Sequence, residues 1–206
     1  MLNGEVLTLL LVVPAYFLGT FPTALLVARA GGHDVLREGS GNPGASNVNR
    51  LMGWKAGALV LVGDFAKGAI AAGVGLAVGG RLGAYVLGAA AVVGHMLPVT
   101  RRFKGGKGVA TAGGMLVVLF PWITIVLGLV WWVIARVLHF ASVASLVIAI
   151  AFPILVAVFG FSGWEIAFTA ALAVLVIARH AANLRRLLIG TELRTDSAVP
   201  PDLEGP

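Results

Sequence analysis

Long apolar runs, separated by short charged or Gly- and Pro-rich breaks, make up most of this chain. A hydrocarbon core of about 30 Å takes about 20 helical residues at about 1.5 Å of rise each. Seven runs come near that length, and we predict a membrane-spanning helix for each: residues 6–28, 56–78, 82–99, 109–120, 122–138, 143–159 and 164–178. The fourth run is too short for an upright span, so we expect it to start in a recessed vestibule or to thin the bilayer locally.

The composition agrees with a membrane protein and excludes a water-soluble one. Of the 206 residues, 59% are hydrophobic and only 12% are charged, against about 45–50% apolar and about 25% charged in soluble domains. So few charges cannot coat a folded body of this size, and lipid must cover much of it. The chain has no cysteine, which excludes disulfides, a thiolate nucleophile and Cys-ligated metals, and its four histidines are scattered. We therefore predict neither a metal nor another cofactor.

The positions of lysine and arginine predict which way the helices run, because cytoplasmic loops carry an excess of these residues. With seven spans, thirteen of the fifteen fall on one face: Arg29, Arg37, Arg50, Lys55, Arg101, Arg102, Lys104, Lys107, Arg136, Arg179, Arg185, Arg186 and Arg194. We therefore predict an all-α integral membrane protein with its N-terminus outside and its C-terminus in the cytoplasm. Residues 1–194 are expected to form one domain and residues 195–206 a disordered tail. Because these loops explain the positive charge, no nucleic-acid partner is expected.

Two charged residues lie inside the second apolar run. Asp64 and Lys67 are three residues apart, so they share one helix face and can neutralise each other. An ionised group deep in lipid costs about 2.5–3.5 kcal/mol, so we expect the pair to face protein or water. We prefer a structural ion pair over a direct role in substrate binding.

The first of three polar clusters, all expected on the cytoplasmic face, covers residues 37–50. Its glycines let the backbone curl with N–H groups pointing inward around an anion, and Arg50 offers a guanidinium suited to phosphate. An ordinary turn between helices is the alternative, because Gly, Ser and Asn are common in turns. We favour the anion site and assign phosphate binding to Ser40, Gly41, Asn42, Asn47 and Arg50.

The second cluster covers residues 94–98 and 103–111, where two lysines flank a diglycine directly before a predicted helix. Unpaired N–H groups and the positive end of the helix dipole favour a phosphate or carboxylate there. The loop is not a Walker A motif, because Lys107 is followed by Gly108. Contacts to lipid headgroups are the alternative. We assign phosphate binding to Lys104, Gly105 and Gly106, and a catalytic role to Lys107.

The third cluster, residues 179–192, is predicted to continue as a helix out of the last span. His180 and Asn183 are three residues apart and can point into the same site. Its arginines are explained by the cytoplasmic end of the span. Ser142 and Ser145, between the fifth and sixth spans, either supply hydroxyls on this face, bond helical carbonyls, or begin the sixth span.

Together the clusters resemble the three signature regions of the bacterial acyl-phosphate-dependent glycerol-3-phosphate acyltransferases, a membrane-integral family. The matching stretches are GSGNPGASNVNR, GHMLP with FKGGKGVAT, and RHAANLRRLLIGTE, in the family's order. Three positions depart from the family's pattern. Leu97 stands where an aromatic residue commonly precedes the proline, Ser46 where threonine is usual, and Leu184 where isoleucine is common.

The resemblance implies a seven-span enzyme of the bacterial inner membrane with its active site on the cytoplasmic side. Such an enzyme moves a fatty acyl group from acyl phosphate to the 1-hydroxyl of glycerol 3-phosphate, giving lysophosphatidic acid and phosphate in the first membrane-bound step of phospholipid synthesis. Its implied partners are both substrates, membrane lipid and, transiently, the soluble enzyme that makes the acyl phosphate. The family's pattern marks Ser40, Arg50, Lys107, Ser145, His180 and Asn183, of which we take the last four as catalytic.

Two other functions compete with this one. A small anion transporter would need polar residues through the whole membrane and inverted repeats, and no internal repeat is visible. A lipid-binding scaffold explains the basic loops but not His180 and Asn183. Acyl phosphate is already activated, so a protein nucleophile is unnecessary. The proton of the attacking hydroxyl goes either to His180 or to a substrate phosphate, and the sequence leaves both open.

Overall fold

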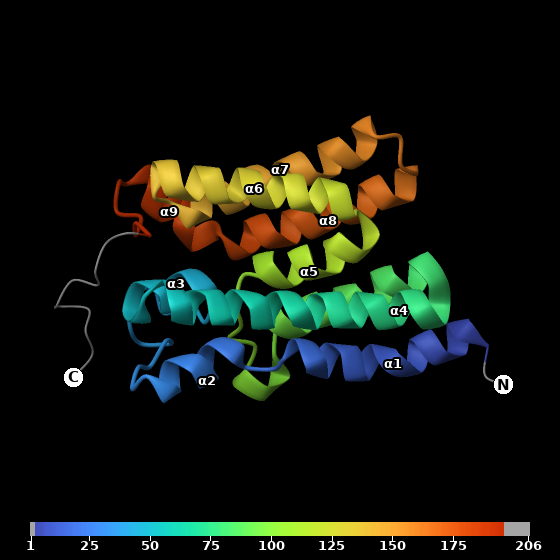
Figure 1. Ribbon diagram of the computed structural model, residues 1–206, viewed down its shortest axis with the longest axis horizontal. Coiled ribbons are helices and arrows are strands. Elements are labelled where there is room, and N and C mark those ends of the chain that lie inside the picture. Colours follow the sequence, from blue (N-terminus) through green and yellow to red (C-terminus); the bar gives the residue numbers. More distant parts are fainter. Residues whose placement is uncertain (1–2, 196–206) are drawn as a thin grey trace. The chain divides into compact units, whose positions relative to one another are not determined.

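The computed structural model describes residues 3–195, and every regular element in that range is a helix (Figure 1). The tail predicted to be disordered lies outside the described residues, apart from Thr195. In chain order the helices are α1 (Gly4–Gly19), α2 (Thr23–Ala30), α3 (Ala45–Met52), α4 (Trp54–Met96), η1 (Val99–Arg101), α5 (Val109–Leu119), α6 (Pro121–Leu138), α7 (Ala141–Val158), α8 (Gly163–Arg179) and α9 (Ala181–Leu188). They form two compact units, the first running to Leu119 and the second beginning at Phe120. The single domain expected over residues 1–194 stays a prediction.

The first predicted span is divided into α1 and α2. Proline at position 22 has no N–H to continue the hydrogen-bond ladder, and the hydroxyl of Thr20 donates to the carbonyl of Phe17 (2.8 Å) at the end of α1. The break leaves backbone carbonyls around Phe21 without helical partners, and the carbonyl of Phe21 accepts a hydrogen bond from Lys67.

The second and third predicted spans are the two halves of α4. Gly79 and Gly80 interrupt the helix, and Gly80 adopts φ 61° and ψ −154°, which only glycine reaches without strain. On either side of the break the halves touch, because a methyl group at Gly75 would clash with the carbonyl of Gly83. The chain therefore reverses direction at the position where the sequence predicted a loop.

Small residues pack these helices closely. Backbone contacts pair Gly4 with Val78, and Gly19 with Ala91, while Ala15 shares an apolar core with Ala71. Helix α1 therefore runs antiparallel to the first half of α4 and parallel to the second, alongside both (Figure 1). Close backbone approach is what glycine and alanine allow in membrane helices.

In the second unit, α7 packs against both α6 and α8. The ring of Phe120 meets those of Phe152 and Phe161 edge to face, with centroids 5.7 and 4.8 Å apart. A capping box of Ser162 and Glu165 starts α8.

The prediction of one continuous helix through residues 179–192 was wrong at His180. Helix α8 ends at Arg179, and α9 begins at Ala181 with a bend of 57° between them. The amide of His180 donates to the carbonyl of Ile177 (2.9 Å), three residues back, which tightens the last turn. This corner places His180 between the two helices.

By length and composition, four of the described helical stretches can cross a membrane, or five if α8 and α9 form one bent span. Two of the four stretches, Gly4–Ala30 and Trp54–Arg101, each join shorter helices. Counting α4 as two spans and the short α5 as one leads back to seven. The count of seven and the orientation stay predictions.

Candidate functional site

The Gly-rich loop of the first unit is organised around the buried amide of Asn47. The side chain of Asn47 is 1% exposed. Its Oδ1 accepts from the amide of Ser40 (2.9 Å), and its Nδ2 donates to the carbonyls of Val35 (3.1 Å) and Glu38 (3.0 Å). Three hydrogen bonds thus hold the loop backbone in one shape. Asn47 was predicted to bind phosphate, and in the structure its side-chain amide bonds to the loop itself.

The rest of this cluster is half loop and half helix. Residues 39–44 form the loop, whereas α3 begins at Ala45 and carries Arg50, whose Nη1 donates to the carbonyl of Ser46 (3.3 Å). The hydroxyl of Ser40 accepts from the amide of Asn42 (3.4 Å). Gly41 lies in the left-handed region, with φ 66°. Ser40, Gly41 and Asn42 are therefore consecutive residues of one loop, which ends where α3 starts.

The acidic residue Glu38 bonds to the chain just before the loop. The carboxylate of Glu38 accepts from the ring Nδ1 of His33 (2.6 Å) and from the amide of Asp34. The bond from His33, and then that from the Asp34 amide, lower the pKa of Glu38. Glu38 is therefore ionised at neutral pH, and its carboxylate holds His33 and the amide of Asp34 next to the start of the loop.

The second cluster follows η1 in the same unit. Arg102 (φ 50°) and Phe103 (φ 63°) adopt consecutive left-handed conformations, which are uncommon for residues other than glycine. They lead into an irregular segment, residues 104–108, that ends at the start of α5. Within it Gly105 and Gly106 are buried, Lys107 is half-buried and Lys104 is exposed. The predicted order of loop, lysine and helix start is therefore present.

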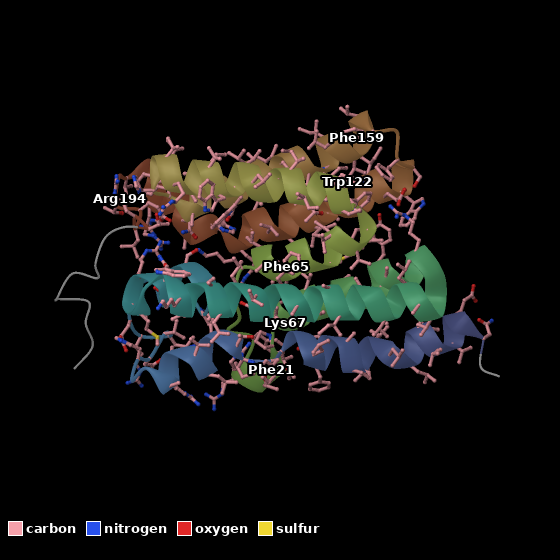
Figure 2. The ribbon with its side chains drawn as sticks, in the orientation of Figure 1. Phe21, Phe65, Lys67, Trp122, Phe159 and Arg194 are labelled. Atoms are coloured by element: carbon pink, nitrogen blue, oxygen red, sulfur yellow. The ribbon has the colours of Figure 1, made fainter. Side chains whose placement is uncertain are left out.

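The ion pair of Asp64 and Lys67 is confirmed as an internal one. Lys67 Nζ lies 2.8 Å from Asp64 Oδ1, and both side chains are 4% exposed. Lys67 also donates to the carbonyl of Phe21 (3.3 Å), at the break between α1 and α2. Figure 2 shows Lys67 on the side of α4 that faces Phe21. The charges therefore face protein.

In the second unit the third cluster is organised around Glu192, whose side chain is 3% exposed. Its Oε1 accepts from Asn183 Nδ2 (2.6 Å) and from the hydroxyl of Ser142 (2.7 Å), and its Oε2 accepts from Arg186 Nε (2.9 Å). Burial alone would raise the pKa of Glu192, but the hydrogen bonds from Asn183, Ser142 and Arg186 outweigh it and the pKa is lowered. Glu192 is therefore a carboxylate at neutral pH.

This carboxylate fixes the orientation of Asn183. A carboxylate only accepts hydrogen bonds, so the Asn183 amide must turn its NH₂ toward Glu192. The Asn183 Oδ1 is buried and has no hydrogen-bond partner within residues 3–195. A buried carbonyl oxygen without a partner is costly, so Asn183 Oδ1 is a candidate acceptor for a ligand.

His180 and Ser145 are also buried in this unit, at 2% and 5% exposure. His180 Nδ1 lies 2.8 Å from the carbonyl of Val176. Because a carbonyl only accepts, Nδ1 carries the proton and donates it to this bond. The hydroxyl of Ser145 donates to the carbonyl of Ala141 (2.7 Å) and accepts from Trp131 Nε1 (2.9 Å). The alternative in which this serine bonds a helical carbonyl is therefore the one observed.

The structure thus gathers the predicted residues into two groups, one in each unit. The loop residues, Arg50 and Lys107 belong to the first, and Ser145, His180 and Asn183 to the second. Sequence reasoning missed Glu192 as the residue that joins Ser142 to Asn183. Its only signal was the acidic end of an otherwise basic stretch. Within residues 3–195 no group of three His, Asp or Glu side chains is placed to hold a metal ion.

The comparisons with known proteins agree with one another. The family profile described as glycerol-3-phosphate acyltransferase matches residues 9–190. A glycerol-3-phosphate acyltransferase of Ralstonia pickettii is 41% identical over 94% of this chain and 96% of its own length, and that of Rubrobacter xylanophilus is 41% identical over 90% and 94%.

Solved structures are similar as well. A crystal structure of PlsY (YgiH), an integral membrane glycerol 3-phosphate acyltransferase, in its glycerol 3-phosphate form has a TM-score of 0.86 at 38% identity and covers 91% of this chain and 94% of that one. The lysophosphatidic acid form of the same protein has a TM-score of 0.84 at the same identity and coverage.

Proposed function

Because the chain belongs to the glycerol-3-phosphate acyltransferase family, we propose that it transfers a fatty acyl group from acyl phosphate to the 1-hydroxyl of sn-glycerol 3-phosphate. The products are lysophosphatidic acid and inorganic phosphate. The observation that carries the proposal is the similarity to PlsY, whose structures hold glycerol 3-phosphate in one form and lysophosphatidic acid in the other. These are the acceptor and the product of the reaction.

The first unit supplies the phosphate-binding groups of the proposed site. Both substrates carry a phosphate, and the loop braced by Asn47 offers fixed backbone N–H groups and the Ser40 hydroxyl. Arg50 and Lys107 add positive charge, and Lys104, Gly105 and Gly106 complete the second phosphate-binding loop. A rigid, positively charged loop stabilises the charge on the departing phosphate without having to rearrange during the reaction.

The second unit supplies the groups that orient the acceptor. Asn183 presents its Oδ1, and glycerol 3-phosphate has two hydroxyl groups that can donate to it, whereas the acyl phosphate dianion has none. His180 presents Nε2 as an acceptor. Ser145 retains one lone pair beyond its two hydrogen bonds. This chemistry favours a hydroxyl donor in the second unit and phosphates in the first.

The reaction needs no protein nucleophile. The 1-hydroxyl oxygen attacks the acyl carbonyl carbon, the bond from that carbon to the phosphate oxygen breaks, and phosphate leaves with the electron pair. The hydroxyl proton passes either to His180 Nε2 or to a phosphate oxygen of the substrate. A His180→Asn variant separates these routes. If the proton passes to His180, the variant loses the acidic limb of the pH–rate profile, because that limb reports protonation of the base; if it passes to phosphate, the profile keeps its shape at a lower rate.

The same proposal places the protein in the bacterial inner membrane with seven spans, its N-terminus outside and the site on the cytoplasmic side. The reversal at Gly79–Gly80 supports two antiparallel spans within α4. The donor reaches the site from a soluble enzyme that makes acyl phosphate, through a transient encounter.

The test uses purified protein in detergent with glycerol 3-phosphate and either palmitoyl phosphate or palmitoyl-CoA. We expect lysophosphatidic acid and phosphate in equal amounts from the acyl phosphate, and no product from the thioester. Product from palmitoyl-CoA alone would overturn the donor. Phosphate transport into vesicles without a covalent product would favour a transporter instead.

A further inference from the structure

A cluster of three buried ionisable residues in the first unit, Asp64, Lys67 and His95, has no role in the proposed mechanism. Asp64, Lys67 and His95 lie in the two halves of α4, and their residues are 3%, 4% and 6% exposed. Asp64 Oδ1 lies 2.8 Å from Lys67 Nζ and 3.6 Å from His95 Nδ1. A helix pair held only by apolar packing needs no such group, and a buried pair of charges is weak support for stability because desolvation offsets the attraction.

His95 connects this group to the diglycine loop. Its carbonyl accepts a hydrogen bond from the amide of Gly106 (3.1 Å), the bond that fixes the loop's position. Its imidazole lies directly under Gly106, where a methyl group would clash with the ring Nε2. A methyl group at Gly105 would clash with the carbonyls of His95 and Met96 and with the ring of Pro98. The ring and backbone of one histidine therefore form the floor on which Gly105 and Gly106 rest.

The floor is itself held in place from two sides. Asp64 faces the imidazole from the first half of α4, and Lys67 ties Asp64 to the carbonyl of Phe21 at the α1–α2 break. On the other side the hydroxyl of Tyr16 donates to the carbonyl of Leu97 (2.7 Å) and accepts from the amide of Val99 (2.9 Å). These contacts hold the ring of His95 and the backbone that directly follows it.

We propose that Asp64, Lys67 and His95 are positioning residues that set the height and angle of the Gly105–Gly106 loop, and through it the place of Lys107. The proposal rests on the phosphate-binding role of that loop in the proposed function. Losing the Asp64 charge leaves the His95 ring without the carboxylate that faces it, so the ring no longer supports the backbone at Gly106 in one position. Lys107 is one residue further along, so phosphate affinity falls while the fold remains.

The experiment compares wild type with Asp64→Asn and with the double variant Asp64→Asn/Lys67→Met. Steady-state kinetics give kcat and the KM for glycerol 3-phosphate. Hydrogen exchange is measured for the peptide that covers residues 104–108. The single variant leaves an unpaired lysine, which also destabilises the fold. The double variant removes both charges and restores charge balance, so it separates the two effects.

We expect the double variant to stay folded, with a KM raised about tenfold or more, a smaller change in kcat, and faster exchange confined to residues 104–108. A Lys67→Arg variant, which keeps the charge, should be close to wild type. Glu165→Gln is the matched control, because Glu165 is a buried carboxylate of the second unit whose loss should leave exchange in the loop unchanged.

Three results would overturn the proposal: a double variant with wild-type KM and loop exchange, exchange that rises equally throughout α4, or a loop equally disturbed by Glu165→Gln. Wild-type protein without acyl transfer would instead refute the proposed function, and the exchange measurement would still decide whether the floor holds the loop.

Discussion

The two units hold their functional groups by opposite chemical means. In the first, the amide of Asn47 donates two hydrogen bonds and accepts one, all with loop backbone. In the second, the carboxylate of Glu192 accepts three, all from side chains. An amide can satisfy both N–H and C=O groups, so it is suited to fixing a backbone loop. A carboxylate only accepts, so it collects donors and orients them.

This difference agrees with the ligand group that we propose for each unit. A fixed backbone loop with added cations suits an anion, which is recognised by several N–H groups at once. A set of side chains turned by one carboxylate leaves Asn183 Oδ1 as an acceptor, which suits a hydroxyl. The comparison therefore assigns phosphate recognition and hydroxyl recognition to different units, and the predictions below test that assignment.

The largest effect is expected from Lys107 and Asn183, the residues that we propose contact substrate. Lys107→Ala should remove charge stabilisation from the first unit. Asn183→Ala should remove the hydroxyl acceptor from the second unit. Each should lower kcat by about 10²–10³-fold, the usual loss for one group that stabilises developing charge. Acyl transfer in membranes at matched protein levels is the measurement, and wild-type turnover in either variant would remove that residue from the site.

The next largest effect is expected from Asn47, around which the loop of the first unit is organised. Asn47→Ala leaves buried backbone groups of the loop without partners, at about 1–3 kcal/mol for each group. We expect the KM for glycerol 3-phosphate to rise about 10–100-fold and the thermal midpoint to fall. Asn49→Ala, a half-buried asparagine on the same helix, is the control. Equal effects from both variants would contradict the role given to Asn47.

In the second unit, replacing a single oxygen atom of Glu192 should have a measurable effect. Glu192→Gln replaces one acceptor oxygen by an NH₂ group that opposes the donors around it, so Asn183 can turn its amide over. We expect kcat to fall about tenfold, with little change in the KM for acyl phosphate. We propose that phosphate binds in the first unit. A Glu192→Gln variant with a raised KM for acyl phosphate and an unchanged kcat would contradict that assignment.

The smallest effect is a pH dependence of stability. The lowered pKa of Glu192 means that its stabilising contribution is fully present above the ordinary value of a glutamate, about 4.3, and is lost as the pH falls through the lower folded-state value. Hydrogen exchange in residues 181–192 should therefore quicken as the pH, after correction for intrinsic rates, falls below about 4. Glu192→Gln should show a flatter profile, and an identical profile would contradict this assignment.

Much of the fold follows from the pattern of apolar runs. The helices α5 to α8 match predicted spans to within about two residues, as periodicity allows. The reversal inside α4 was predicted because Gly79 and Gly80 precede Arg81 at the end of an apolar run. The corner at His180 was not, because its backbone bond to Ile177 and ring bond to Val176 use a residue that is also compatible with a helix.

The sequence predicted which residue types make up the candidate site, but not the hydrogen bonds that connect them. Gly, Ser, Lys and Asn in the three clusters indicated phosphate chemistry. Asn47 and Glu192 looked like any other polar residue of their clusters, since their roles depend on tertiary contacts with Val35 and Ser142, 12 and 50 residues away. The Asp64–Lys67 pair could be foreseen because helical spacing alone places the two charges together.

The central claim is that the three clusters lie on one side of the membrane. Because the chain has no cysteine, single cysteines can be placed at Asn42, Lys104 and Arg185, with Gly163 as the position predicted on the opposite side. The measurement is labelling by a membrane-impermeant maleimide in inverted and right-side-out vesicles. The account predicts that the first three are labelled only in inverted vesicles and the fourth only in right-side-out ones. Labelling of any one of the first three from the opposite side would contradict it.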